Sequence, residues 1–318
     1  CEDAPDRIVC CRSESPLVIG LGEGGNYVAS DVSALIRRTR RVCYLEEKSI
    51  AVVKANGVEF YDGEGERYQP EVREVEWNVE AAEKGGYAHF MLKEIHEQPR
   101  AVRDTVQTRI HDGRICLKGL DDETMRRVER IVICACGTAY HAGMVAKHYL
   151  ERLARMPVET DIASEYRYRQ PIIHPNDLCI VVSQSGETAD TIAALRTFHA
   201  GGGKVLGVVN VVGSTVERES DIVVHTWAGP EIGVASTKAY TTQLSALLMI
   251  AMEFGRVRGT LSPEAYTELV KGLLCLPEKV GQALLAEPAI QRLSGEQFNQ
   301  RDVFFMGRGL DYPATLES

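Results

Sequence analysis

Short apolar runs alternate with amphipathic stretches through the middle of the chain, and this alternation predicts strands interleaved with helices. Parallel strands connected by helices form a doubly wound sheet that is covered on both faces, so the predicted fold class is α/β. A helix at 121–128 precedes the series. The pattern predicts strands at 130–136, 158–162, 178–183, 205–209 and 222–225, and helices at 140–153, 189–200 and 237–258.

The first part of the chain follows another pattern, in which short strand-like segments are separated by turns rich in glycine. Residues 64–88 are polar and read as a connector, and 90–113 predict a helix that contains Pro99. The strands are too few to enclose a core of their own, so we expect the end of a larger domain. Predicted strands lie at 16–21, 41–45, 49–54 and 58–61, with turns at 22–25 and at Asn56-Gly57.

The end of the chain repeats the design of the middle. After a helical region at 263–300, an apolar strand at 302–306 is expected to break at Gly307-Arg-Gly309, as the strand from Ile131 breaks at Gly137. The repeat predicts that a second α/β domain begins near residue 290 and is cut off at Ser318.

Composition narrows the function classes. The 318 residues suit two or more domains, and no apolar run is long enough for a membrane span or a signal peptide, so we expect a cytoplasmic protein. A net charge of −9 disfavours nucleic-acid and membrane partners. Nine scattered cysteines without a CxxC pair predict reduced thiols, buried at Cys134, Cys136 and Cys179, and no metal site.

The most informative stretch is Leu178-Cys-Ile-Val-Val-Ser-Gln-Ser-Gly-Glu-Thr-Ala-Asp-Thr-Ile192, in which an apolar strand breaks into a hydroxyl-rich turn and then a helix. Ser183, Ser185 and Thr188 supply hydroxyls, Gly186 lets the backbone approach, and the helix offers free N–H groups to an anion. Capping the helix would need only one hydroxyl. The pattern therefore predicts a monophosphate site at the carboxyl ends of the strands, shared with the turn that holds Thr138.

Other candidate residues are less sharply defined. In the segment before the last long helix of the sheet domain, Val234, Ala235 and Ser236 are placed on the same rim, where they would line the sugar side. Lys238 reads equally well as a phosphate cation, a Schiff-base amine or a structural lysine. His141 lies near the crevice. Cys1 has an acidic, prolyl context and reads as an ordinary residue at a fragment boundary.

Four motifs in the chain are Cys136-Gly-Thr-Ala-Tyr-His-Ala-Gly143, Ser183-Gln-Ser-Gly-Glu-Thr-Ala-Asp-Thr191, Glu231-Ile-Gly-Val-Ala-Ser-Thr-Lys238 and Met306-Gly-Arg-Gly309. Together they resemble the isomerizing glutamine–fructose-6-phosphate aminotransferases. Each motif is shared with other sugar-isomerase (SIS) domains, but the amidotransferase-like strands and Lys93-Glu-Ile-His-Glu-Gln-Pro99 point to this family in particular.

The resemblance implies a glutaminase domain that frees ammonia, followed by two SIS domains that convert fructose 6-phosphate to glucosamine 6-phosphate in a homodimer without a cofactor. Residues 1–75 would be the end of the glutaminase domain, an N-terminal-nucleophile amidotransferase with an α+β sandwich fold. Residues 76–120 would be a linker and helical hinge, 121–262 the first SIS domain, and 290–318 the start of the second. The glutamine site and most catalytic residues would lie outside this chain, which would retain sugar-phosphate binding.

The same resemblance implies roles for individual residues. Ser183, Gln184, Ser185 and Thr188 correspond to the phosphate clamp, and Thr138 to a neighbouring contact. Val234 and Ser236 correspond to sugar contacts, and Glu317 to a carboxylate of the catalytic cluster. The chain departs from many members at Ala139, where they have serine, which removes a hydroxyl from this site.

Two other functions fit parts of the sequence. One is a non-catalytic SIS module that senses sugar phosphates, and the other is a SIS deglycase or deaminase without a glutaminase domain. The glutaminase-like strands weigh against the sensor, as does the lack of a helix-turn-helix with a basic face.

Overall fold

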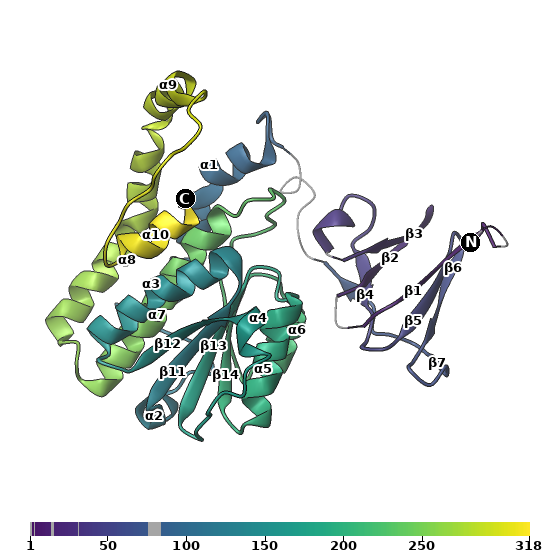
Figure 1. The fold of residues 1–318 in the computed structure, drawn as a ribbon, viewed down its shortest axis with the longest axis horizontal. Helices are drawn as coiled ribbons and strands as arrows, with labels where there is room; N and C mark the ends of the chain where they lie inside the picture. Colours follow the sequence, from purple (N-terminus) through teal and green to yellow (C-terminus); the bar gives the residue numbers. More distant parts are fainter. Residues whose placement is uncertain (1, 3, 14–15, 31, 76–83) are drawn as a thin grey trace. The chain divides into compact units, whose positions relative to one another are not determined.

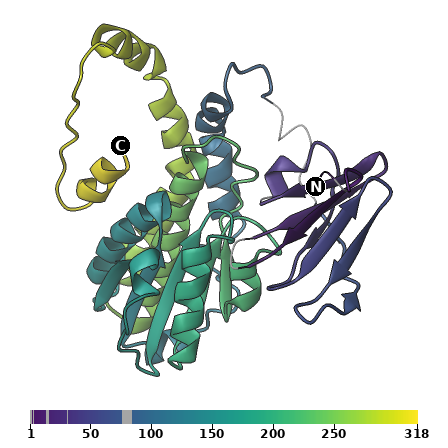
Figure 2. The ribbon, with the colours of Figure 1, turned by 45° about the vertical axis from the view of Figure 1, so that its right-hand side comes forward.

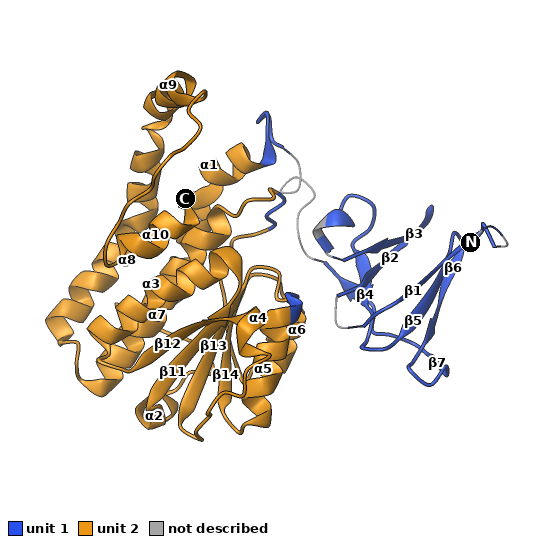
Figure 3. Cartoon of the chain, in the orientation of Figure 1, with its two compact units in different colours: residues 1–90, 187–189, 230–232 blue, residues 91–186, 190–229, 233–318 orange. Residues whose placement is uncertain are grey.

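The computed structural model describes residues 2, 4–13, 16–30, 32–75 and 84–318. Cys1 and residues 76–83 of the expected linker lie outside the described residues. The chain divides into two compact units, coloured separately in Figure 3. The first comprises residues 1–90 with 187–189 and 230–232, and the second comprises 91–186, 190–229 and 233–318.

The first unit contains two four-stranded antiparallel sheets (Figure 1). Buried side chains from both sheets, among them Ile19, Cys43, Val53 and Phe60, form one core, so the sheets pack as a sandwich. A short 3-10 helix, η1 (Val32–Ala34), follows β3. One sheet has the order β1 (Arg7–Cys11), β5 (Ile50–Lys54), β6 (Gly57–Tyr61), β7 (Arg67–Tyr68), and the other β3 (Gly25–Ala29), β2 (Val18–Gly22), β4 (Arg41–Tyr44), β8 (Arg73–Glu74).

The four strands predicted for this region are present as β2, β4, β5 and β6. The prediction missed β1 and β3, and also β7 and β8, which lie within the stretch 64–88 that the sequence predicts to be a connector. β1 is an edge strand that is mostly exposed, so its sequence lacks the apolar alternation that a half-buried strand shows.

The second unit is built on a five-stranded sheet whose neighbouring strands are all parallel, which confirms the predicted doubly wound α/β fold. All seven residues of the central strand, β13, are buried, as expected for a sheet covered on both faces. The strand order is β12 (Val158–Ile162), β11 (Arg130–Ala135), β13 (Asp177–Ser183), β14 (Lys204–Val209), β15 (Ile222–His225).

Helices cover both faces of this sheet (Figure 2). The larger core joins one face to α1 (Phe90–Gln107), α2 (Asp122–Arg127), α3 (Gly137–Leu153), α7 (Lys238–Arg258) and α8 (Pro263–Leu284). The smaller core joins the other face to α4 (Ala163–Tyr166), α5 (Ala189–Ala200) and α6 (Thr215–Glu219). A small hairpin, β9 (Ile110–His111) and β10 (Arg114–Ile115), connects α1 to α2.

The last part of the chain corrects one prediction. After α9 (Glu287–Gln297), the expected strand at 302–306 has no regular secondary structure, and Phe304 and Met306 are exposed. A strand is stable only beside another strand, and no strand among the described residues pairs with this one. The chain then returns to α10 (Asp311–Glu317), which packs against α3 (Figure 1).

None of the helices in the described ranges is both long enough and apolar enough to cross a membrane.

Candidate functional site

The strand order places two of the predicted turns at a topological switch point. From β11 the chain passes to β12, which lies on one side of β11, and then to β13, which lies on its other side. The connections that follow β11 and β13 therefore run in opposite directions along the sheet. Cys134 pairs with Val181, and the two strands therefore end at the same level. Ligands of open α/β sheets bind where connections diverge in this way. Thr138 follows one of these strands and Ser183 ends the other.

The turn after β13 is held in a defined shape. Ser183 is buried, and its Oγ accepts a hydrogen bond from the Gly186 N–H at 2.9 Å. Gly186 has a φ of +66°, and a Cβ there would lie 2.1 Å from Oγ of Ser214. The Gly186 carbonyl in turn accepts from Val216 N at 3.0 Å. Only glycine fits at this position, and hydrogen bonds within the protein define the shape of the turn.

The remaining predicted clamp residues follow this turn directly. Gln184 and Ser185 are half-buried and belong to the second unit. Thr188, also half-buried, lies in the stretch 187–189 that is grouped with the first unit, immediately before α5.

Asn210, just after β14, ties the carboxyl ends of three strands together and was missed by the sequence analysis. Its backbone N–H donates to the Gln184 carbonyl at 3.2 Å, and its Nδ2 donates to the Gly229 carbonyl at 2.7 Å. Its Oδ1 accepts from the Ala228 N–H at 2.7 Å and from the Thr226 hydroxyl at 3.2 Å. The signal available in the sequence was an asparagine directly after an apolar strand, because a buried amide needs hydrogen-bond partners.

Helix α10 brings three predicted residues together at the start of α3. Thr138 Oγ1 donates to Glu317 Oε1 at 2.7 Å, and His141 Nδ1 lies 2.6 Å from Glu317 Oε2. The carboxylate thus bonds to side chains of the first turns of α3, where the helix dipole favours negative charge. Burial, and then the charge of Glu317, raise the pKa of Tyr240 to about 12.

The predicted sugar contacts in the segment 233–238 differ in solvent exposure. Val234 is fully exposed, at 108%, whereas Ser236 is half-buried. Lys238 is buried and its Nζ lies 2.6 Å from Glu97 Oε2 on α1. This ion pair favours the structural alternative for Lys238, because the ammonium group is already neutralised. Ala139 packs its methyl group against the larger core.

The predicted buried thiols are confirmed for two cysteines. Cys134 and Cys179 are fully buried and free, and Cys136 is half-buried. A hydrogen bond with Cys179, together with burial, raises the pKa of the Cys134 thiol far above its ordinary value. These thiols are therefore unreactive core groups. The described part of the chain contains no group of three or more metal-ligating side chains.

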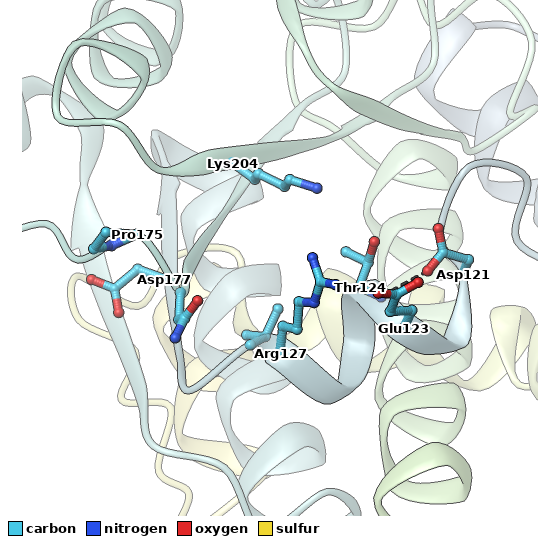
Figure 4. Close-up of a pocket in the computed structure, with 9 residues that line it drawn as sticks. Asp121, Glu123, Thr124, Arg127, Pro175, Asp177 and Lys204 are labelled. Atoms are coloured by element: carbon cyan, nitrogen blue, oxygen red, sulfur yellow. Dashed lines mark hydrogen bonds and ion pairs between the residues drawn. The ribbon is translucent and has the colours of Figure 1, made fainter.

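A cavity of about 210 Å³ lies at the opposite, amino edge of the sheet (Figure 4). Arg127 and Lys204 point toward it, but Asp121, Glu123 and Asp177 line it as well. Three carboxylates against two cations make this cavity a poor match for a phosphate dianion. The carboxyl edge, with its hydroxyls and backbone N–H groups, is the better candidate.

Comparison with known proteins shows what this chain is similar to. A family model described as SIS domain matches residues 124–253. The glutamine–fructose-6-phosphate aminotransferase (isomerizing) of Caldanaerobacter subterraneus subsp. tengcongensis is 52% identical over 320 residues, which cover 100% of this chain and 53% of that protein. Its counterpart in Clostridium acetobutylicum is 49% identical, covering 98% of this chain and 52% of that protein.

A solved structure is similar as well. The C-terminal domain of glucosamine-fructose-6-phosphate aminotransferase from Francisella tularensis matches with a TM-score of 0.71 and 40% identity, covering 74% of this chain and 66% of that one. The present chain is thus an α/β protein that contains a SIS domain. It spans about half the length of the curated relatives it matches, and over that part its sequence is similar to the glutamine–fructose-6-phosphate aminotransferases.

Proposed function

We propose that this chain binds fructose 6-phosphate and glucosamine 6-phosphate through its SIS domain, as part of an enzyme that aminates and isomerises fructose 6-phosphate with nitrogen from glutamine. The observation that carries the proposal is the hydrogen-bonded turn at Ser183 and Gly186, which lies at the switch point of a sheet whose sequence is similar to this family. Because these hydrogen bonds hold the turn, binding of a ligand there would cost little conformational entropy.

In this proposal the phosphate lies against the turn after β13. Ser183, Gln184, Ser185 and Thr188 would bond the phosphate oxygens, as hydroxyls and N–H groups do at the start of a helix. Thr138 would approach from the neighbouring strand. These donors are uncharged, so the phosphate would be held by hydrogen bonds rather than by an ammonium or guanidinium group.

The sugar would extend from the phosphate toward Val234 and Ser236. Glu317, bonded to Thr138 and His141, would place a carboxylate near the reacting carbons, where a base is needed to move a proton between them. Its link to Thr138 would couple the carboxylate to the phosphate end of the site.

The wider organisation also remains a proposal. Residues 1–75 would be the C-terminal part of a glutaminase domain, and their two packed antiparallel sheets suit a sandwich fold. Residues 76–120 would be the linker and hinge, 121–262 the first SIS domain, and 290–318 the start of the second. Glutamine would bind in the glutaminase domain, and the enzyme would act as a cytoplasmic homodimer.

Isothermal calorimetry with fructose 6-phosphate tests the clamp. We expect the double substitution Ser185→Ala and Thr188→Ala to weaken binding by at least about tenfold, because several hydrogen bonds to a charged group are lost. Thr267→Ala, an exposed hydroxyl on α8, is the matched control and should leave the affinity unchanged. A double variant that binds as tightly as the unaltered chain would refute the clamp assignment.

A further inference from the structure

We infer that Glu94 and Glu97, both on α1, are positioning residues that fix the segment 233–238 for sugar binding. The inference rests on the proposed function, because that segment holds the proposed sugar contacts Val234 and Ser236. Neither glutamate is itself a proposed ligand contact. They act on the site by holding the backbone that carries it.

Glu94 fixes the beginning of the segment. Its side chain is buried, and its carboxylate accepts from the Gly233 N–H, with oxygen distances of 3.2 and 3.1 Å. A Cβ at Gly233 would lie only 2.6 Å from Glu94 Oε2, so the carboxylate lies directly against the backbone. The residue held in this way immediately precedes Val234, whose side chain is fully exposed.

Glu97 fixes the end of the segment. It lies three residues after Glu94, and therefore on the same face of α1. Its Oε2 lies 2.6 Å from Nζ of Lys238, the first residue of α7, and its Oε1 lies 3.4 Å from Nζ of Lys93. Both lysines are buried, so Glu97 is the counter-charge for two ammonium groups shielded from water.

Helix α1 is itself anchored to the sheet, which gives the two glutamates a fixed base. The Thr105 hydroxyl donates to the Thr226 carbonyl, and the Arg109 guanidinium donates to the carbonyls of His225 and, at 2.6 Å, Thr105. The helix is thus bonded to the carboxyl end of β15 and, further along, to both ends of the segment 233–238. A segment held at both ends loses less conformational entropy when a ligand binds.

The first test removes the bond to Gly233 in the 318-residue chain. We expect Glu94→Ala to weaken fructose 6-phosphate binding by at least about tenfold in calorimetry, and to speed amide hydrogen exchange at 233–237 by a similar factor. Glu94→Gln keeps a carbonyl acceptor and should stay within about threefold of the unaltered chain. Glu278→Ala, an exposed carboxylate on α8, is the matched control and should change neither quantity.

The second test separates positioning from general stability. Glu97→Gln alone removes the negative charge that lies beside the two buried ammonium groups of Lys93 and Lys238, and should lower Tm. Adding Lys238→Met removes one of these charges and should recover part of the Tm, while the affinity for fructose 6-phosphate stays at least about tenfold weaker because α7 is no longer tied to α1.

Two results would overturn the inference. One is a folded Glu94→Ala variant with unchanged affinity and unchanged exchange at 233–237. The other is a Tm that is lowered in every variant while the affinity for fructose 6-phosphate stays that of the unaltered chain. This combination would mean that the two glutamates have a purely structural role. If the unaltered chain does not bind fructose 6-phosphate, the proposed function fails, while the exchange rates at 233–237 still decide whether Glu94 fixes the segment.

Discussion

At the carboxyl edge of the parallel sheet, Ser183, Gly186 and Asn210 meet as uncharged groups, whereas the amino edge carries charged pairs. There Arg130 bonds to Asp177, and Arg127 bonds to Glu123. The charges of the amino edge satisfy one another and leave little capacity for a dianion. The carboxyl edge offers oriented hydroxyls and N–H groups, although Glu187 lies within the turn 183–188 and the Glu317 carboxylate bonds to Thr138 beside it. The difference supports the proposal that a phosphate would be held at the carboxyl edge by oriented neutral donors rather than by collected positive charge.

Among substitutions at the carboxyl edge, Gly186→Ala should lower the free energy of unfolding the most. The positive φ costs about 1 to 2 kcal/mol for an alanine, and the collision of its methyl group with Ser214 adds about 1 to 3 kcal/mol. Urea unfolding should therefore show a loss of about 2 to 5 kcal/mol, the sum of these two ranges.

Gly202→Ala is the matched control for this substitution. Gly202 also has a positive φ, of +84°, but a Cβ there would meet nothing within 4 Å. We expect it to cost only the backbone strain, about 1 to 2 kcal/mol. Equal losses in the two variants would show that the contact with Ser214 does not shape the turn.

Asn210→Ala should have the next largest effect. It removes three side-chain hydrogen bonds and leaves partners at the buried Ala228 and the half-buried Gly229 unsatisfied, for an expected loss of about 2 to 3 kcal/mol. Thermal unfolding measures the loss. Because Asn210 also bonds to the Gln184 carbonyl through its backbone, the variant keeps that contact, and a Tm equal to that of the unaltered chain would contradict its role as a link between strands.

The amino edge should respond to pH through Asp177. Burial opposes ionisation of Asp177, but hydrogen bonds from Arg130 and the His174 N–H outweigh it and lower its pKa. A lowered folded pKa gives stability that is present above the unfolded value of about 3.9 and is lost as the pH falls through the folded value.

Urea midpoints between pH 5 and pH 3 test this linkage, over a window of about two units around the unfolded pKa. The midpoint of Asp177→Asn should fall less steeply with acid than that of the unaltered chain, and Asn210→Ala should keep the unaltered slope. This acid-linked part of the stability should be smaller than either loss at the carboxyl edge. Parallel curves for Asp177→Asn and the unaltered chain would count against the assigned pKa shift.

The smallest effect is expected at the exposed pair of the amino edge. Arg127 and Glu123 have side chains 72% and 71% exposed, so Arg127→Ala should change the free energy of unfolding by less than about 0.5 kcal/mol. A larger loss in urea unfolding would mean that the charges around the cavity of Figure 4 support one another more than their exposure indicates.

The regular elements of the SIS domain could be predicted because their signals are local. The strand at 158–162 and the helix at 189–200 have the predicted bounds, since apolar periodicity and turn residues define them within a few positions. The helix predicted from residue 140 begins earlier, at Gly137, whose positive φ lets the chain turn directly from strand to helix. Sequence periodicity does not report such a turn.

The contacts that fix the site could not be predicted in the same way. The Asn210 side chain bonds to residues 16 to 19 positions away, and Glu97 bonds to Lys238 across 141 positions. Such pairs depend on which helix lies against which strand, and a single sequence does not specify this. The expected strand at 302–306 failed for a related reason, since a strand needs a neighbour that the described chain does not provide.

Amide hydrogen exchange with and without fructose 6-phosphate tests the central claim most directly, because it reports both edges of the sheet in one experiment. The account predicts slower exchange at 183–188 and at 233–237 when the sugar phosphate is present, with no change around Arg127 and Asn176. Slower exchange at the amino edge, with none at 183–188, would contradict it.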